Sequence, residues 1–238
     1  MKHILLENPF SQGRQLSFYL AMEDYVVSKI DEPEAFFTWQ VAPTVIIGRN
    51  QILENEVDVA YCRQHGINIF RRKSGGGCVY ADEDNLMLSF IAHTDNVAWS
   101  FNCFTGMLTN VLTRLGLKAV VTDHNDVLVD GQKVSGTACR QLFGHCIVHS
   151  TLLYDTNMQH MLHAITPSTQ KLQRKGVKSV DQRITLLRNY MPDTPLSQLN
   201  HFICTTLCKG SICLGADNAA AIEQIEQEYL SSQFIQKM

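Results

Sequence analysis

The order in which strand-like and helix-like segments follow one another is the feature that most limits how this chain can fold. Short apolar segments with the alternation or burial typical of strands crowd the first two thirds of the sequence, and helical periodicity dominates the remainder. A regular strand–helix–strand alternation, which a parallel α/β sheet requires, is absent. The sequence therefore predicts an α+β fold with mixed or antiparallel sheets. The predicted strands are 35–39, 44–48, 67–72, 78–80, 85–92, 117–121, 126–129, 132–138 and 145–154.

Helical segments are predicted from apolar residues that recur every three or four positions. Residues 85–92, in contrast, are apolar at both alternating sets of positions, which predicts a strand buried on both faces. The predicted helices are 15–30, 56–65, 99–115, 156–164, 169–174, a segment after Pro195, and 218–230.

Composition excludes several classes of protein. The chain has 238 residues, of which 45% are apolar and 18% charged, so it can bury a core and is not disordered. Its net charge of −3 argues against nucleic acid as the main partner. No apolar run is long enough for a membrane span, and residues 1–10 form a short strand-like stretch rather than a secretory leader. We expect one cytoplasmic domain over 1–238, with a small C-terminal subregion possible at 195–238 after the PDTPL break.

The stretch RRKSGGG at 71–77 is the strongest local indication of a binding site. Adjacent glycines adopt backbone conformations barred to other residues and expose their N–H groups, which can form a concave site for an anion. Arg71, Arg72 and Lys73 add positive charge, although at most one of the two arginines can face the ligand if the strand persists. The pattern is not a Walker A motif. A flexible hairpin with solvated basic residues competes with a phosphate or carboxylate site.

A β-hairpin is predicted at 125–138 because Asp130-Gly131 is a strong signal for a two-residue turn. This loop would pair Leu128 with Lys133 and Asp126 with Ser135. Period-2 alternation then places Asp126, Leu128, Lys133 and Ser135 on one face, opposite three valines on the core side. Lys133 could stabilise negative charge on a reacting carboxyl or phosphoryl group, or this face could simply be solvated.

Thiol and imidazole groups near these motifs allow two further interpretations. Cys78 or Cys139 could be a nucleophile beside His145 or His149, although a structural role is favoured. The two histidines are four residues apart on one strand, a rise of roughly 13 Å, so they cannot share one metal ion. The eight cysteines contain no C-x-x-C pair and are expected to be reduced and mostly buried.

Together these motifs resemble the lipoate–protein ligase A family. RRKSGGGCVYAD resembles the family signature R-R-x-S-G-G-G-x-V-x-H-D, and VIIGRNQ at 45–51 with Glu56 resembles its I-G-R-x-Q…E element. NDVLVDGQKVSGTA is similar to its N-D…K-V-S-G-T-A element, and HSTLL at 149–153 to H-G-T-L-L. KLQRKGVKSVDQRITLL at 171–187 is similar to a fifth family stretch. The resemblance covers about residues 15–190.

This resemblance implies a biotin/lipoate protein ligase-like fold, with a large mixed sheet and a smaller sheet flanked by helices. It implies that lipoate and ATP, with Mg²⁺ entering on the nucleotide, give lipoyl-AMP and pyrophosphate. The acyl group would then pass to one lysine of an apo lipoyl domain of the 2-oxoacid dehydrogenases, or of the glycine cleavage H protein.

The resemblance also assigns roles to individual residues. Lys133 is the implied catalytic residue, placed between the acyl carbonyl and the α-phosphate. Arg72 and the glycine loop would surround the lipoyl-AMP, Asn125 and Asp126 would hold magnesium or the nucleotide, and His149 would line the lipoyl pocket; no resident metal site is implied. The full set of implied binding residues is Arg72, Gly75, Gly76, Gly77, Cys78, Val79, Tyr80, Asn125, Asp126, Ser135, Gly136, Thr137, Ala138 and His149.

Two departures from the family pattern leave alternatives open. Ala81 stands where the signature has His, and the chain ends near where many members begin an accessory domain that serves adenylation. A separate accessory protein could supply that step, or the chain could transfer the acyl group from preformed lipoyl-AMP. An octanoyl- or lipoyl-transferase that uses a cysteine before the hairpin is disfavoured, because 117–126 contains none. A lipoate-binding protein without activity is the remaining alternative.

Overall fold

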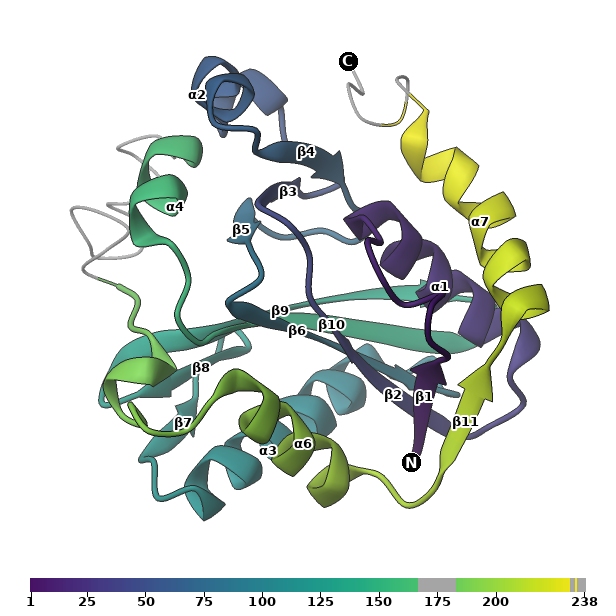
Figure 1. Cartoon of the computed structure of the whole chain (residues 1–238). Helices are drawn as coiled ribbons and strands as arrows, with labels where there is room; N and C mark the ends of the chain where they lie inside the picture. The colour runs from purple at the N-terminus through teal and green to yellow at the C-terminus, as the bar shows by residue number, and fades with distance from the viewer. Residues whose placement is uncertain (167–182, 232–233, 235–238) are drawn as a thin grey trace.

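The computed structural model describes residues 1–166, 183–231 and 234, and its described strands form two sheets (Figure 1). Most of the 171–187 motif and the predicted helix 169–174 lie outside the described residues. The large sheet contains, in spatial order, β11 (Ser211–Leu214), β1 (Lys2–Leu6), β2 (Glu34–Trp39), β6 (Asn85–Ala92), β10 (His145–Leu153), β9 (Gln132–Leu142), β8 (Asp126–Val129) and β7 (Ala119–Val121).

The small sheet and the helices complete the predicted α+β architecture. The small sheet has the order β4 (Asn68–Arg71), β3 (Thr44–Ile47), β5 (Val79–Ala81). Both sheets are mixed, because β1 is parallel to β11 and β2, and β3 is parallel to β4, while the other pairs are antiparallel. The helices are α1 (Leu16–Lys29), α2 (Val59–Gln64), α3 (Val97–Arg114), α4 (Met158–Ala164), α6 (Leu196–Leu207) and α7 (Ala216–Leu230), with 3-10 turns at Leu53–Asn55 and Leu187–Asn189.

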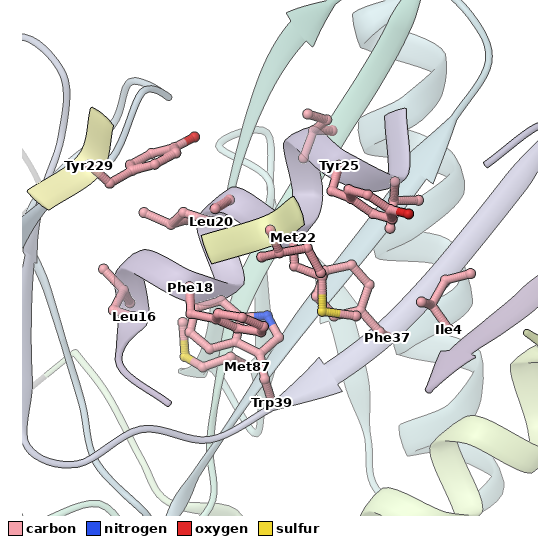
Figure 2. Packing of buried hydrophobic residues seen from close by; sticks show 14 of the residues in the cluster. Ile4, Leu16, Phe18, Leu20, Met22, Tyr25, Phe37, Trp39, Met87 and Tyr229 are labelled. Atoms are coloured by element: carbon pink, nitrogen blue, oxygen red, sulfur yellow. The ribbon is translucent and has the colours of Figure 1, made fainter. Parts of the chain in front are cut away.

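The two faces of the large sheet carry separate hydrophobic clusters. Helices α3 and α6 cover one face, where Phe104 and Ile203 are buried against Phe90 and Val148 of the sheet. Helices α1 and α7 cover part of the other face, and the small sheet lies beside them (Figure 1). Figure 2 shows Leu16, Phe18, Trp39 and Met87 in the cluster under α1. The central strand β6 is buried along its whole length, as its sequence predicts.

The start of one helix and the presence of one strand differ from the sequence prediction for local reasons. The helix expected at 56–65 begins only at Val59, because the Asp58 carboxylate accepts the N–H of Tyr61 at 2.8 Å and caps it there. It ends before Gly66, whose φ of +65° fits the predicted C-cap. Strand β11 is absent from the prediction, because its four residues are too few to show a period. Strand β11 pairs with β1 of the large sheet, and α7 packs against α1.

The predicted turn of the β8–β9 hairpin is confirmed, but its register is only partly correct. Asp130 and Gly131 have φ values of 48° and 81°, as the two-residue turn requires, and Leu128 pairs with Lys133. A β-bulge then shifts the register, so Val127 pairs with Ser135 and Asp126 with Gly136. The extra residue turns Ser135 to the face opposite Lys133. The prediction that Ser135 shares the face of Lys133 is therefore wrong.

Among the described helices, none combines the length and the apolar character that crossing a bilayer requires.

The packing of α3 on the sheet generates a stability prediction. Phe104→Ala removes a fully enclosed ring beside Phe90, so it should lower the free energy of unfolding by about 3–5 kcal/mol. Thr113→Ala, at an exposed position of the same helix, is the control and should change it by less than about 0.5 kcal/mol. Urea unfolding monitored by circular dichroism measures both, and equal midpoints for the two variants would contradict this packing.

Candidate active site

A cavity of about 260 Å³ lies between the glycine loop, the β8–β9 hairpin and α1. One part of its wall is apolar and comes from α1, β2 and β6, with Leu16, Leu20, Trp39 and Met87. The other part is polar and cationic, with Arg72, Lys133 and Arg183. A ligand with an apolar tail and an anionic end would match these two parts.

Arg72 holds the glycine loop in shape. Its guanidinium, buried at the end of β4, donates to the carbonyl oxygens of Gly75 and Gly77, both at 2.7 Å, and to that of Ile46 at 3.2 Å. Burial lowers the pKa of Arg72 to about 10, so it is still charged at neutral pH. Because C=O and N–H of one trans peptide point in opposite directions, the bond to the Gly75 carbonyl turns the N–H of Gly76 away from the guanidinium. Gly76 itself lines the cavity, where a backbone N–H can donate to an anion.

The loop also depends on glycine at two positions in close contact. Gly76 has a φ of +90°, which other residues rarely adopt. A Cβ atom on Gly48 would lie 2.3 Å from the carbonyl oxygen of Gly76, so only glycine allows the two backbones to approach. The N–H of Arg49 donates to the Ser74 carbonyl at 2.9 Å and ties the loop to the segment after β3.

The other two basic residues of the motif point elsewhere. Arg71 is buried and donates to the carbonyls of Gly48 and Gln51, both at 2.8 Å. Lys73 pairs with Asp24 of α1 and Glu228 of α7. Thus Arg72 alone of the three lines the cavity, which agrees with the prediction that at most one of the two arginines faces a ligand.

Lys133 reaches the cavity by crossing over Gly136. A Cβ atom on Gly136 would lie 2.5 Å from the Lys133 Nζ and 2.8 Å from its Cε, so a side chain there would displace the lysine. The Lys133 side chain is only 18% exposed and its Nζ lies 2.7 Å from Asp126 Oδ1. Burial lowers the pKa of Lys133, and the carboxylate of Asp126 opposes this shift. The lysine is therefore an enclosed cation rather than part of a solvated face.

Asp126 also pairs with Arg183, a cavity residue that the sequence analysis missed. The Arg183 guanidinium contacts the second carboxylate oxygen of Asp126. Its backbone carbonyl accepts the Lys133 N–H at 2.8 Å, and the Thr185 N–H donates back to the Lys133 carbonyl at 3.0 Å. In the sequence, the indication of Arg183 is its place in the 171–187 motif, since no local pattern places it beside the hairpin.

The structure brings most of the expected site residues together. The cavity is lined by Arg72, Gly76, Gly77, Cys78, Val79, Asp126, Lys133, Gly136, Thr137, Ala138 and His149.

Four expected residues, Gly75, Tyr80, Asn125 and Ser135, do not line this cavity. Gly75 supplies a carbonyl to Arg72, and Tyr80 packs in the cluster beneath α2 and α4. Asn125 has a φ of 58° in the turn before β8. Ser135 is fully buried beside Ser150, because the bulge turns it to the other face.

The two thiols that could act as nucleophiles differ in position. Cys78 lines the cavity, whereas Cys139 pairs with Val148 and packs on the α3 face of the sheet. Burial raises the pKa of Cys139 to about 12, so its thiol is protonated at neutral pH and is not an activated nucleophile. His145 stacks on His93 with ring centroids 4.3 Å apart and does not line the cavity.

The described residues do not form a dedicated magnesium cage. No cluster of three or more His, Cys, Asp or Glu suited to a metal occurs in the described ranges. Both oxygens of the Asp126 carboxylate already contact cations. Mg²⁺ bound mainly by nucleotide phosphates would need few protein ligands.

The Lys133–Asp126 pair yields a prediction with a definite sign. In Asp126→Asn the carboxylate that raises the lysine pKa is lost while burial and the Arg183 charge remain, so the pKa of Lys133 should fall further. The ¹⁵N resonance of the Lys133 Nζ, followed across pH, measures it. Asp130→Asn, at the exposed hairpin turn, should leave the titration unchanged. An unchanged or higher pKa in Asp126→Asn would show that the pair does not hold the lysine.

The close approach of Gly48 to the glycine loop yields a second prediction. Gly48→Ala places a methyl group against backbone, so the loop must shift and the thermal midpoint should fall by several degrees. Gly106→Ala is the control, because nothing lies within 4 Å of a Cβ atom there and the residue is in α3. Calorimetry compares the two variants, and equal midpoints would rule out the close contact.

Comparison with known proteins places this site in a family. The family model for the lipoyl protein ligase A/B catalytic domain matches residues 15–207. A lipoate-protein ligase of Bacillus subtilis (strain 168) is 35% identical over 176 residues, 73% of this chain and 53% of that protein. Lipoate–protein ligase 1 of Staphylococcus aureus is also 35% identical over 176 residues, 73% of this chain and 54% of its own length. The chain thus spans about half the length of these curated relatives.

Solved structures agree with the fold. The bi-partite lipoate protein ligase from Thermoplasma acidophilum has a TM-score of 0.84 at 21% identity, covering 99% of this chain and 95% of that one. A lipoate-protein ligase A bound with ATP has a TM-score of 0.82 at 19% identity, covering 99% of this chain and 98% of that one. These similarities confirm the predicted fold of a large mixed sheet with a smaller one. With the match over residues 15–207, the chain belongs to the lipoyl protein ligase A/B catalytic domain family.

Proposed function

We propose that this chain is a lipoate–protein ligase domain that activates lipoate with ATP and transfers the lipoyl group to a lysine of an apo lipoyl domain. The observation that carries the proposal is the enclosed Lys133 ammonium, which lies over Gly136 and lines the cavity. The glycine loop, held by Arg72, lines the same cavity. The names of the relatives support the substrate class, since the similar proteins are lipoate-protein ligases and one solved neighbour is bound with ATP.

The two parts of the cavity match the two ends of lipoyl-AMP. The apolar wall of Leu16, Leu20, Trp39 and Met87 would take the lipoyl tail. The glycine loop and the cations Lys133 and Arg183 would surround the phosphate and the acyl linkage. A nucleotide at Cys78 and Val79 would extend from this loop along β5.

In the first half-reaction, a lipoate carboxylate oxygen forms a bond to the α-phosphorus of ATP, and the bond to the pyrophosphate oxygen breaks. Negative charge concentrates on the α-phosphate oxygens in this step. Lys133 would stabilise that charge from a position enclosed away from bulk water, where a fixed cation is most effective. Hydrogen bonds from the N–H groups of the loop would hold the phosphate in line for attack.

In the second half-reaction, the acceptor lysine amine attacks the lipoyl carbonyl, an amide bond forms, and AMP leaves with the electron pair of the C–O bond. The amine must lose a proton, which leaves with solvent or on AMP. The same Lys133 would then polarise the carbonyl and stabilise the oxyanion. Asp126 favours the charged form of the lysine in both steps, since it opposes the effect of burial on the pKa of Lys133.

The acceptor in this proposal is a lipoyl domain of a 2-oxoacid dehydrogenase or the glycine cleavage H protein, in the cytoplasm. One similar structure, from T. acidophilum, is described as a bi-partite ligase with its E2 lipoyl domain. That description supports a lipoyl domain as acceptor and an accessory protein as a possible second component.

One assay tests the reaction and its alternatives. The chain is mixed with lipoate, magnesium and ATP, and an apo lipoyl domain, and the mass of the acceptor is followed; a parallel reaction receives synthetic lipoyl-AMP instead. Product in both reactions supports the complete ligase. Product only from lipoyl-AMP means that the chain is a transferase whose adenylation step needs another protein. Lipoate binding without product in either reaction would overturn the enzymatic proposal.

Lys133→Ala should abolish acyl transfer while the fold persists. Asp126 keeps Arg183 as a partner in this variant, so we expect the thermal midpoint to stay within a few degrees of wild type. Transfer from lipoyl-AMP should fall by about a hundred-fold or more. Lys118→Ala, an exposed lysine before β7, is the matched control and should retain full rate. A Lys133→Ala protein that turns over normally would remove the lysine from the mechanism.

A further inference from the structure

Glu23 is a fully buried carboxylate that the mechanism above does not use. It lies in the middle of α1 with 0% of its surface exposed. An ionised carboxylate costs several kcal/mol to bury unless partners compensate it. Its hydrogen-bonded partners come from two central strands: Ser89 of β6 donates to Glu23 Oε1 at 2.7 Å, and His149 Nδ1 of β10 lies 3.1 Å from both carboxylate oxygens.

These contacts belong to a continuous chain of hydrogen bonds between the two parts of the cavity. Trp39 Nε1, in the apolar wall, donates to Ser89 Oγ at 2.9 Å. At the other end, His149 Nε2 lies 2.6 Å from Ser74 Oγ, and Ser74 Oγ accepts from Arg72 Nε at 3.0 Å. Since Arg72 also donates to the Gly75 and Gly77 carbonyls, this series of hydrogen bonds reaches the glycine loop.

The donors at the two ends and the carboxylate between them limit the directions of the hydrogen bonds. Trp39 Nε1 and Arg72 Nε can only donate, and an ionised carboxylate can only accept. Ser89 therefore donates to Glu23, and His149 donates from Nδ1. Ser74 accepts from Arg72, so its own hydroxyl proton is available to His149 Nε2. All bonds are satisfied when His149 is neutral with its proton on Nδ1.

Several partners compensate the buried Glu23. Burial by itself would raise the pKa of Glu23, but the charge that His149 carries when protonated, the hydrogen bonds from His149 and Ser89, and the charge of Arg140 lower it below the ordinary value. The carboxylate is thus ionised at neutral pH and accepts two hydrogen bonds.

We propose that Glu23 is a positioning residue that holds the glycine loop in its binding conformation through His149 and Ser74. It touches neither the loop nor the reacting atoms: it selects the His149 tautomer whose Nε2 can accept the Ser74 hydroxyl. The ligand that reports the loop position is ATP, so this readout rests on the proposed function, whereas the tautomer of His149 does not.

The experiment combines ring-nitrogen NMR with nucleotide binding on the intact chain. Glu23→Met removes both acceptor oxygens, so the ¹⁵N resonances of His149 should change from protonated Nδ1 and bare Nε2 to a mixture of tautomers. The dissociation constant for magnesium-ATP, measured by calorimetry, should rise about ten-fold. Glu23→Gln keeps one acceptor oxygen, and it should stay closer to wild type than Glu23→Met in both measurements.

A double-mutant cycle separates positioning from general damage to the core. Ser74→Ala removes the hydrogen bond between His149 and the glycine loop. It should weaken ATP binding while His149 keeps its proton on Nδ1. Because Glu23 acts through Ser74, adding Glu23→Met to Ser74→Ala should weaken ATP binding little further. Glu226→Met is the matched control. Glu226 of α7 accepts a hydrogen bond from Ser17 of α1, the helix that carries Glu23, but it takes no part in the hydrogen bonds between Trp39 and Arg72, so the variant should change neither readout.

Three results would overturn the proposal. They are an unchanged His149 tautomer in Glu23→Met, additive losses of ATP affinity in the double variant, or a Glu23→Gln protein as impaired as Glu23→Met. If the wild type binds no ATP, the proposed function fails instead, and the tautomer measurement still decides the role of Glu23.

Discussion

The ion pairs of Asp126 organise the candidate site. One carboxylate oxygen contacts Lys133 and the other contacts Arg183, so a single acidic group compensates two enclosed cations. The same contacts attach the segment at Arg183 to the β8–β9 hairpin, where backbone bonds to Lys133 reinforce them. Two features of the chain make the pairing possible: the β-bulge that brings Asp126 opposite Gly136, and the missing side chain at Gly136 itself.

The site combines two scaffolds with different tasks. The small sheet carries the glycine loop, whose shape depends on the buried Arg72 and on the contact between Gly48 and Gly76. The large sheet carries the cation, Lys133. A loop of glycines is intrinsically flexible, so it can bind an anion well only if other residues fix its conformation. The side chains of Ser74 and His149 connect that loop to the large sheet and, through Glu23, to helix α1.

The parts of the site that follow from local sequence patterns could be predicted from the sequence. The Asp130-Gly131 turn pairs Lys133 correctly with Leu128. Alternation limits the cavity-lining arginines to one of Arg71 and Arg72, and the motif resemblance names Arg72, which lines the cavity. No local pattern marks the β-bulge that follows, so strict alternation places Ser135 on the wrong face. Glu23 and His149 are 126 positions apart, and no periodicity links a glutamate in a predicted amphipathic helix to a strand histidine. The motif resemblance supplied the family, but it gave no indication of this contact.

The central claim is that Lys133 and the glycine loop together hold an acyl–phosphate linkage, with the acyl tail against the apolar wall. A crystal structure with a non-hydrolysable sulfamoyl analogue of lipoyl-AMP tests it most directly. The account predicts the Lys133 Nζ within hydrogen-bonding distance of the linkage, the Gly76 N–H directed at it, and the lipoyl tail against Trp39 and Met87. An analogue bound elsewhere, or bound here with its linkage beyond the reach of Lys133, would contradict the account.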